Sequence, residues 1–228
     1  MKIQQLNYPA KSHRKSVKIP KPSPSLAELF GIMLGDGGIN NPWQANITLN
    51  AIRDREYSRY VMDLWERLFG IVPAVRKRKT REALVVSLAS TTVVDFLGEM
   101  GLPRGNKLAQ GLSIPAWIME DRGYRIACLR GLMDTDGCLY IHRHRLGART
   151  YRNIGLCFTS HAHKMMLQVA SILSECGIVP HVSGGGRRIY LYSQDAVKKY
   201  LDVVGTSNPR LERVYVDWKS SRANQSAS

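Results

Sequence analysis

Two aspartates, each followed by a glycine, are the residues of this chain that best suit metal-dependent chemistry. Asp36 and Asp136 lie far apart in the chain, and each ends a run of residues with helical spacing. A carboxylate at a helix C-terminus faces the negative end of the helix dipole, which costs about 0.3 to 1 kcal/mol per charge. A divalent cation removes that cost, because Mg²⁺ prefers carboxylate, carbonyl and water oxygens as ligands. A single Asp-Gly pair also fits an ordinary turn, whereas two matched pairs favour a metal site.

The runs that contain these aspartates repeat one another, and so do later landmarks of the chain. Three landmarks recur in the same order: Leu29 to Gly37 as Leu129 to Gly137, Gly70-Ile-Val-Pro as Gly177-Ile-Val-Pro, and Gly101 as Gly205. Three echoes in one order predict a protein of two similar halves. The second half is longer after its first landmark, and we place the extra residues in the polar stretch from His142 to Asn153, because a hairpin loop tolerates insertion.

Within each half the hydrophobic pattern predicts a helix, two strands, a helix, two strands and a helix. The first helix is expected to begin at about Ser25, a suitable N-cap. Alternation then places Ile47 and Leu49 on the inner face of a strand, with polar residues between them on the outer face. Helical spacing returns from Arg53 to Phe69 and ends at Gly70 as a C-cap. Helices therefore cover one face of each sheet and leave the other face polar.

Two glycines in the first helix indicate that another helix approaches closely. Gly31 and Gly35 lie four residues apart, and each costs about 1 kcal/mol relative to alanine in a helix. Gly131 occupies the matching place in the second half, and Thr135 replaces the second glycine there. We therefore expect the two first helices to pack against each other along these small residues and to end side by side.

The uncovered sheet faces suit contact with DNA. A two-stranded ribbon fits the major groove, where basic, amide and hydroxyl side chains read base edges. The residues expected to contact DNA are Asn40, Gln44, Asn46, Thr48, Arg53, Arg76, Arg78, Tyr140, His142, His144, Arg188, Tyr190 and Tyr192. The His-x-His pairs that begin at His142 and His161 lack a third ligand nearby, so we interpret them as DNA-face or capping residues and not as a zinc site.

The charge balance favours a polyanion as partner. The chain has 33 Lys and Arg residues against 18 Asp and Glu residues, a formal net charge of +15. Such an excess is typical of proteins that bind nucleic acid. No membrane contact is expected, because no apolar run approaches the roughly 18 residues of a membrane span. Residues 1–24 are basic and lack an apolar signal-peptide core, so we expect a flexible arm that meets the phosphate backbone.

The four cysteines show no CxxC spacing and lie among apolar residues. We interpret Cys128, Cys138, Cys157 and Cys176 as buried free thiols and not as a zinc site or as disulfides. Free thiols indicate an intracellular, reducing location, which is the cytoplasm or nucleoid, or an organelle in a eukaryote.

The two repeated runs resemble the nine-residue LAGLIDADG signature of homing endonucleases. The predicted order of helices and hairpins also resembles the αββαββα half of that family over about residues 25–215. The resemblance implies an α+β fold, a pseudo-twofold saddle in which two four-stranded antiparallel sheets straddle DNA and the paired motif helices lie at the centre. The expected divisions are a basic arm at 1–24, a first repeat at 25–120, a second repeat at 121–216 and a polar C-terminal tail at 217–228.

The resemblance also implies hydrolysis of both DNA strands across the minor groove, which leaves short 3′ overhangs. Asp36 and Asp136 match the family's metal-binding acids, and the carbonyls of Gly35 and Thr135 match its backbone ligands. They would hold two or three Mg²⁺ or Mn²⁺ ions, which activate a water and stabilise the leaving 3′ oxygen. The implied partner of a monomeric protein is double-stranded DNA with a long, partly degenerate target site, and host intron RNA is a further partner that the family allows.

Further positions match residues around the family's catalytic acids. Lys107, by its place after the second hairpin and helix, matches a lysine that stabilises the transition state or organises water, and a solvated loop lysine is the alternative. Arg210 is its only basic counterpart in the second half. Asn50, with Thr159 or Ser160 in the second half, matches a polar residue that orients water, and capping of the following helix is the alternative.

The sixth motif position, Leu34 in one half and Asp134 in the other, concerns packing in the family and is not interpreted as catalytic.

The first hypothesis is a site-specific endonuclease encoded by a mobile intron. The chain starts with Met1 and a basic arm and lacks an intein's splicing blocks, so we expect a free-standing product. The second hypothesis keeps the fold and loses cleavage, as an RNA maturase or a transcriptional DNA binder. Loss of a motif aspartate favours the second, and both aspartates are present.

Overall fold

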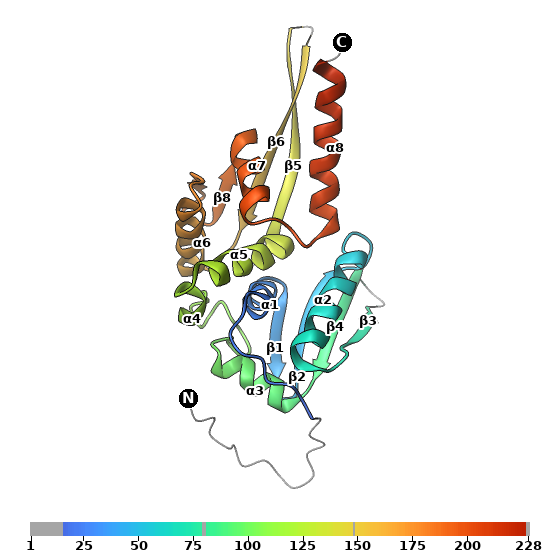
Figure 1. Ribbon diagram of the computed structural model, residues 1–228, viewed down its shortest axis with the longest axis vertical. Coiled ribbons are helices and arrows are strands. Elements are labelled where there is room, and N and C mark those ends of the chain that lie inside the picture. Colours follow the sequence, from blue (N-terminus) through green and yellow to red (C-terminus); the bar gives the residue numbers. More distant parts are fainter. Residues whose placement is uncertain (1–15, 79–80, 148, 227–228) are drawn as a thin grey trace.

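Each half of the chain forms a four-stranded antiparallel sheet with helices on one face, as a computed structural model shows for residues 16–78, 81–147 and 149–226 (Figure 1). The first half contains α1 (Pro24–Gly35), β1 (Gly37–Asn41), β2 (Gln44–Asn50), α2 (Arg55–Phe69), β3 (Ala74–Lys77), β4 (Ala83–Ala89) and α3 (Thr91–Glu99). Its strands pair in the order β1-β2-β4-β3.

The second half repeats this plan after a short connecting helix, α4 (Ala116–Met119). It contains α5 (Arg122–Asp136), β5 (Gly137–Leu146), β6 (Arg149–Thr159), α6 (His163–Glu175), β7 (His181–Ser183), β8 (Arg188–Leu191), α7 (Gln194–Val203) and α8 (Pro209–Ser226). Its strands pair in the order β5-β6-β8-β7, so the two sheets have the same topology. The predicted α+β fold of two similar halves is confirmed. The division expected between residues 120 and 121 falls between α4 and α5.

Helix α1 begins earlier than the sequence predicts. The hydroxyl oxygen of Ser23 accepts a hydrogen bond from the backbone N–H of Leu26 at 3.3 Å, and Pro24 is the first helical residue. Ser25 as N-cap was therefore wrong. The extended backbone of Ser23 lets its side chain reach the free N–H groups of the first turn, and the fixed φ of proline suits the first helical position.

The glycines that repeat between the halves occupy the left-handed region of backbone space. Gly70 and Gly177 have φ values of 69° and 68°, and Gly101 and Gly205 have values of 103° and 74°. A residue with a Cβ is strained there, so glycine ends a helix readily at such positions. Gly70 is the C-cap of α2, as the sequence predicts.

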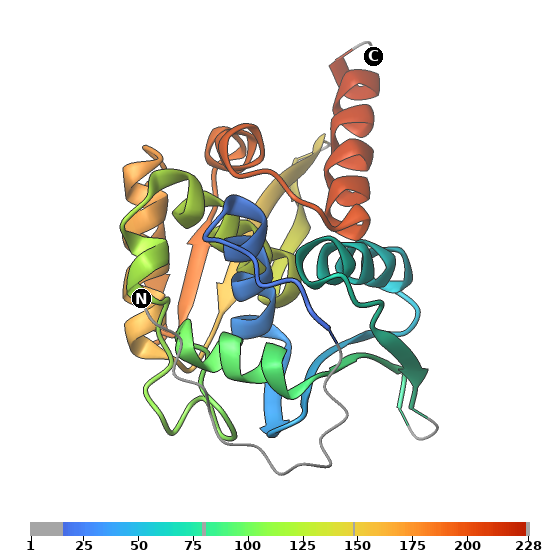
Figure 2. The same ribbon diagram turned by 60° about the horizontal axis from the view of Figure 1, so that its bottom comes forward.

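Helices α1 and α5 pack backbone to backbone at the centre of the molecule, between the two sheets (Figures 1 and 2). A Cβ added to Gly31 would overlap the carbonyl oxygen of Cys128, and one added to Gly131 would overlap the carbonyl oxygen of Glu28. The predicted contact along small residues is confirmed. This contact is what brings the two helix ends together.

The strands alternate as expected between a buried and an open face. Ile47 and Leu49 of β2 are buried, and so are Ile189 and Leu191 of β8. Polar side chains between them are partly exposed on the other face. The helices therefore cover only one side of each sheet, and the opposite side stays open for a ligand.

The second half is longer because its first hairpin is longer. Strands β5 and β6 have 10 and 11 residues, whereas β1 and β2 have 5 and 7. Strand β8 pairs only with the stretch of β6 from Leu156 to Thr159, so the remainder of the hairpin extends as a two-stranded ribbon beside α8 (Figure 1). This confirms the placement of the extra residues between His142 and Asn153.

Two expected terminal segments are part of the folded body. Residues 217–226 continue helix α8, so the part of the expected polar tail that the structure describes is helical. Trp218 explains the helix, because its ring is 5% exposed and its Nε1 donates to the carbonyl of Arg152 at 2.9 Å. At the other end, the backbone N–H of Lys18 donates to the carbonyl of Phe69 at 3.0 Å. The expected flexible arm is therefore ordered from residue 16 onward, and its residues 1–15 lie outside the described residues.

The cysteines are free, but only two of the four are buried. Cys128 and Cys176 lie in the core, whereas Cys138 is exposed and Cys157 is half-buried. The prediction of burial was wrong for this second pair, because they face each other across β5 and β6 on the open side of the sheet. No described helix is both long and apolar enough to cross a membrane.

Candidate metal centre and DNA-binding face

Asp36 and Asp136 meet where α1 and α5 end side by side. Asp36 directly follows the last turn of α1, and Asp136 is the last residue of α5. A Cβ added to Gly35 would lie 3.2 Å from the Oδ2 atom of Asp136, so the second carboxylate lies against the end of the first helix. The fold therefore brings together the two acids that the sequence singles out.

Burial makes both acids hold their protons more tightly. Burial, followed by the negative charge of Asp136, raises the pKa of Asp36 to about 7. Burial raises the pKa of Asp136 to about 6, and the positive charge of Lys107 opposes the rise. Two adjacent carboxylates with raised pKa values mark a place that favours added positive charge.

Lys107 lies at the end of α1 and not in solvent. Its Nζ donates to the carbonyl oxygens of Met33 at 3.3 Å, of Leu34 at 2.8 Å and of Gly37 at 2.8 Å, and also to that of Gly35. Burial lowers its pKa, and the charges of the two aspartates oppose that shift. The alternative of a solvated loop lysine is therefore wrong, while a catalytic role for this lysine stays a prediction.

The chemistry of the helix ends fits a magnesium site. The two carboxylates and the carbonyls of Gly35 and Thr135 supply hard oxygens. The side-chain hydroxyl of Thr135 is already used, because it donates to the carbonyl of Gly131 at 3.1 Å. The backbone carbonyl of Thr135 is therefore the candidate ligand. In the described part of the chain, no group of three or more His, Cys, Asp or Glu residues is arranged to hold a metal. An ion here would complete its shell with carbonyl, water and phosphate oxygens, and the Gly35 carbonyl already accepts a hydrogen bond from Lys107.

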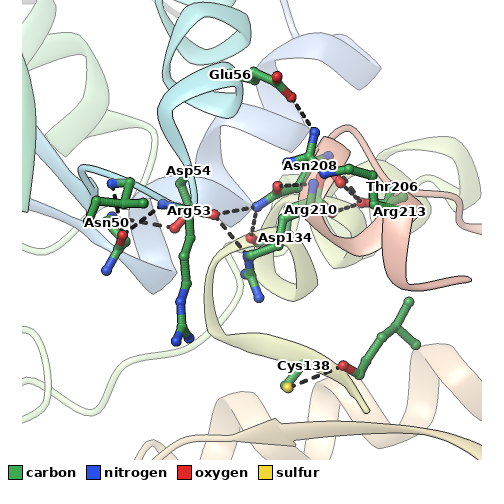
Figure 3. A network of polar contacts seen from close by, with 12 residues as sticks. Asn50, Arg53, Asp54, Glu56, Asp134, Cys138, Thr206, Asn208, Arg210 and Arg213 are labelled. Carbon is green, nitrogen blue, oxygen red and sulfur yellow. Dashed lines mark hydrogen bonds and ion pairs between the residues drawn. The ribbon is translucent and has the colours of Figure 1, made fainter. Parts of the chain in front are cut away.

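Asn50 caps the turn that precedes α2. Its Oδ1 accepts hydrogen bonds from the backbone N–H groups of Ile52 at 3.0 Å and of Arg53 at 2.8 Å (Figure 3). Its own backbone N–H donates to Oδ2 of Asp54 at 3.4 Å. The side-chain oxygen is thus used within the turn, and the capping interpretation is the one that the geometry supports.

The two matching residues of the second half differ from each other. The hydroxyl oxygen of Ser160 accepts from the backbone N–H of Ala162 at 3.2 Å, so Ser160 is also a cap. Thr159 is opposite Arg188 in the sheet register, and its hydroxyl oxygen lies 3.6 Å from the sulfur of Cys157. Thr159 therefore keeps a hydroxyl on the open face of the sheet.

Arg210 reaches across from the second half to the first. Its Nε donates to Oδ1 of Asp54 at 3.0 Å, and Nδ2 of Asn208 donates to the same oxygen at 3.1 Å (Figure 3). The positive charge of Arg210 lowers the pKa of Asp36, whereas burial raises it. Asp54 therefore holds an arginine of the second half close to the metal-site acid of the first.

The second-half counterpart of Lys107 is a neutral residue. Nδ2 of Asn208 donates to the backbone carbonyl of Asp134 at 2.9 Å. In the first half, the lysine makes the matching bond to the carbonyl of Leu34. Asn208 is 1% exposed and carries no charge. The two halves thus bring one lysine to the paired acids, as the sequence suggests. The sequence did not identify Asn208 as the residue at the matching position of the second half.

Asp134 fixes the segment that carries Asn208 and Arg210. Its carboxylate accepts from the backbone N–H of Ser207 at 2.8 Å and from the hydroxyl of Thr206. Asp134 is 1% exposed, and burial raises its pKa to about 7. The structural role expected at this motif position is therefore supported, through hydrogen bonds as well as packing.

A buried ion pair joins the two motif helices away from the metal site. Oε2 of Glu28, a residue of α1 that is 2% exposed, lies 2.6 Å from the guanidinium of Arg130 on α5. Oε1 of Glu28 accepts from the hydroxyls of Tyr60 and Ser207, each at 2.7 Å. The sequence signal was an acid within the apolar run Leu26-Ala-Glu-Leu-Phe, where a charge needs a buried partner.

The open face of the first sheet forms a groove of about 830 Å³ that runs up to Asp36. Six of the residues expected to contact DNA line it, namely Asn40, Gln44, Asn46, Thr48, Arg76 and Arg78. Asp36 and Lys107 of the candidate metal centre line it as well. Arg53 does not line this groove, and its side chain points away from the polar contacts of Asp54 (Figure 3).

The open face of the second sheet is aromatic. Tyr140, Arg188 and Tyr190 occupy its strands, and Tyr192 follows the end of β8. His142 and His144 lie farther out, on the ribbon that extends beyond β8. The residues expected to contact DNA in this half thus share one face, and their contact with DNA stays a prediction.

The chain resembles known protein domains over most of its length. Residues 27–131 match the family model of the WhiA LAGLIDADG-like domain, and residues 123–208 match that of the LAGLIDADG-like domain. A comparison with curated proteins found no match.

Several solved structures share the fold. The LAGLIDADG meganuclease I-AabMI bound to uncleaved DNA matches with a TM-score of 0.57 and 13% identity, over 90% of this chain and 92% of that chain. The I-LtrWI LAGLIDADG homing endonuclease bound to target DNA matches with a TM-score of 0.59 and 9% identity, over 90% and 92%. Mesophilic variants of the homing endonuclease I-DmoI match with a TM-score of 0.53 and 15% identity, over 81% and 97%. At these identities the likeness shows the fold.

Proposed function

The chain belongs to the LAGLIDADG family, and we propose that it is a site-specific, metal-dependent endonuclease that cuts both strands of duplex DNA. One observation carries the proposal, the meeting of Asp36 and Asp136 at the ends of two helices whose backbones touch. A groove lined with amides, hydroxyls and basic side chains leads to Asp36. The net charge of +15 favours a polyanionic substrate.

The chemistry would depend on divalent ions held between the helix ends. The carboxylates of Asp36 and Asp136, with the carbonyls of Gly35 and Thr135, would hold two or three Mg²⁺ or Mn²⁺ ions. Such ions activate a water molecule and stabilise the leaving 3′ oxygen of a phosphodiester. Lys107 brings a buried positive charge to both acids, and Arg210 brings one to the first acid. These two cations would attract and orient the phosphates of the backbone.

Cleavage of both strands follows from the pairing of the acids. Each half supplies one carboxylate, and the two lie next to each other, which suits two phosphodiesters that face each other across the minor groove. Cuts at such a pair leave short 3′ overhangs. Both acids belong to one chain, so a monomer would be complete, and the many open-face side chains suit a long target site that is partly degenerate. An origin in a mobile intron is part of the proposal, with intron RNA as a further partner.

A second candidate is DNA binding without cleavage. The match of residues 27–131 favours it, because that model is described as the WhiA LAGLIDADG-like domain and its description names no nuclease. The contact of Lys107 with the Gly35 carbonyl also favours it, since the positive charge of the lysine competes with an ion for this oxygen.

Incubation with DNA that contains the intron-insertion junction separates the two candidates. We expect the full chain to bind this duplex in Ca²⁺ and to cut both strands in Mg²⁺ at one position. Added EDTA should stop cleavage. Tight, selective binding with no strand cut in Mg²⁺ or Mn²⁺ would reject the endonuclease and favour the non-cleaving DNA binder.

A further inference from the structure

We propose that the two sheets read the two halves of the DNA target by different chemistry. The first sheet would read base edges through directed hydrogen bonds, and the second sheet would contact a longer stretch of duplex through tyrosine and histidine edges with little base preference. The inference rests on the DNA-binding part of the proposed function and does not depend on cleavage.

The strand registers allow the two open faces to be compared position by position. In the first sheet, Gly38 pairs with Asn46, and Asn46 pairs with Ser87, which pairs with Ala74. The corresponding row of the second sheet consists of Cys138, Cys157, Tyr190 and His181. An amide and a hydroxyl in one half thus correspond to a thiol and a phenol in the other.

The neighbouring row differs in the same way. Gln44 pairs with Ala89 in the first sheet. By the same register, Gly155 takes the place of the glutamine, and Tyr192 takes that of the alanine. In these two rows, large aromatic side chains replace small ones on the second sheet and the amides are lost, whereas the row of Thr48 and Val85 corresponds to Thr159 and Arg188.

The first face presents hydrogen-bonding side chains that other described residues do not use. The side chains of Gln44, Asn46, Thr48 and Ser87 line the groove, and none of them forms a hydrogen bond to another described residue. An amide offers donors and an acceptor in fixed directions, so it distinguishes adenine from the other bases in the major groove. Such a face discriminates base by base.

The aromatic rings of the second face contact one another. The rings of Tyr190 and Tyr192 stack with centroids 5.1 Å apart and an interplanar angle of 8°. The ring of His181 lies 5.3 Å from that of Tyr192. Tyr140 covers Gly155, since a Cβ added to this glycine would lie 2.5 Å from the Tyr140 hydroxyl.

Rings that stack on each other present edges and hydroxyls outward. Single-stranded nucleic acid is bound by stacking of bases on free ring faces, and the contact between Tyr190 and Tyr192 covers one face of each ring. A hydroxyl acts as both donor and acceptor, so it can form a hydrogen bond with most base edges and with phosphate oxygens. We therefore infer contact with duplex DNA that fixes position more than sequence.

The same chemistry continues along the ribbon. The rings of His144 and Tyr151 stack at 5.3 Å and 14° on the part of the hairpin beyond β8. Strand β5 has 10 residues against 5 in β1. The extra residues add about 16 Å at about 3.3 Å per residue, which corresponds to about five base pairs. The second half-site should therefore be the longer one as well as the less selective one.

Selection of bound duplexes from a randomised pool tests the inference. The full chain is incubated with the pool in Ca²⁺, and the recovered sequences are compared on either side of the centre. We expect a short half-site in which each base substitution weakens binding roughly 5- to 100-fold. In the other, longer half-site, single substitutions should weaken binding less than about 3-fold.

Two matched variants assign each half-site to its sheet. Asn46→Ala should remove the base preference at one position of the selective half-site. Tyr190→Ala, in the same row of the other sheet, should weaken binding to all sequences alike and should leave every base preference in place. Tyr192→Ala, at a side chain that is 56% exposed, repeats the second measurement with little risk to folding.

Equal selectivity in the two half-sites would overturn the inference, and so would a changed base preference in both tyrosine variants. The two proposals fail separately. A chain that binds one selective and one tolerant half-site without cutting would reject the endonuclease alone. A chain that cuts a site with two equally selective halves would reject only the difference in readout.

Discussion

Replacement of Gly131 by alanine tests the contact between α1 and α5 that brings the acids together. A Cβ at this position would overlap the carbonyl oxygen of Glu28 and lie 2.8 Å from the backbone nitrogen of Ile32. Both neighbours are backbone atoms, so no side-chain rotation relieves the clash, and the helices must separate. Overpacking costs about 1 to 3 kcal/mol. Because two backbone groups clash, we expect a cost near the upper end of this range. Alanine in place of glycine returns about 1 kcal/mol through its higher helix propensity.

The net loss of about 2 kcal/mol in the free energy of unfolding corresponds to a fall in Tm of about 4 to 8 °C for a chain of this size. Gly98→Ala in α3 is the matched control, because the atoms nearest to its added Cβ belong to the flexible side chain of Arg104 at 3.2 Å. The control should gain up to about 1 kcal/mol from helix propensity. Thermal and urea unfolding followed by circular dichroism measure both variants. A Gly131→Ala variant as stable as the control would show that the two helix backbones do not touch at this glycine.

Three further predictions concern the charges at the site. Lys107→Met should keep DNA binding in Ca²⁺ and slow single-turnover cleavage in Mg²⁺ about 100-fold, because a positive charge near the reacting phosphate is lost; an unchanged rate would remove its catalytic role. Asp54→Asn and Arg210→Ala should slow cleavage to a similar extent, and a double variant no slower than either single one would show that they act as a pair, whereas additive effects would contradict this. Metal binding should depend on pH, because the folded-state pKa values of Asp36 and Asp136, about 7 and about 6, lie above the 3.8 of an ordinary aspartate. The metal-free chain then loses stability as pH rises from about 4 to about 7, and the rise in Tm caused by Ca²⁺ should grow over the same range in a thermal-shift assay. A rise in Tm that is the same at pH 5 and pH 8 would contradict the burial of these acids.

The fold was predictable because its causes are local and occur twice. Gly31 and Gly131 indicate the helix contact, and the glycines at 70 and 177 end the matching helices. The two acids could be identified for the same reason, since each follows a repeated run. Ser23 and Ser25 both suit an N-cap by residue type, and only the backbone conformation decides between them.

The contacts around the acids could not be predicted in this way. Asp54 binds Asn208 and Arg210, which lie more than 150 residues farther along the chain, and no periodic pattern connects residues at that separation. Cys138 and Cys157 were assigned to the core from their apolar neighbours, although strand alternation places both on the open face. Their positions depend on the register of the long hairpin.

We propose that Asp36 and Asp136 together hold the ions that cut both DNA strands. The most direct test is single-turnover cleavage of a supercoiled plasmid that carries the target, by the wild type, Asp36→Asn and Asp136→Asn in Mg²⁺. Asparagine keeps the shape and removes the charge, so both variants should fold and should bind the target in Ca²⁺. We expect the wild type to linearise the plasmid and each variant to do so at least about 100-fold more slowly. Linearisation at the wild-type rate by either variant, or binding without cleavage by the wild type, would contradict the claim.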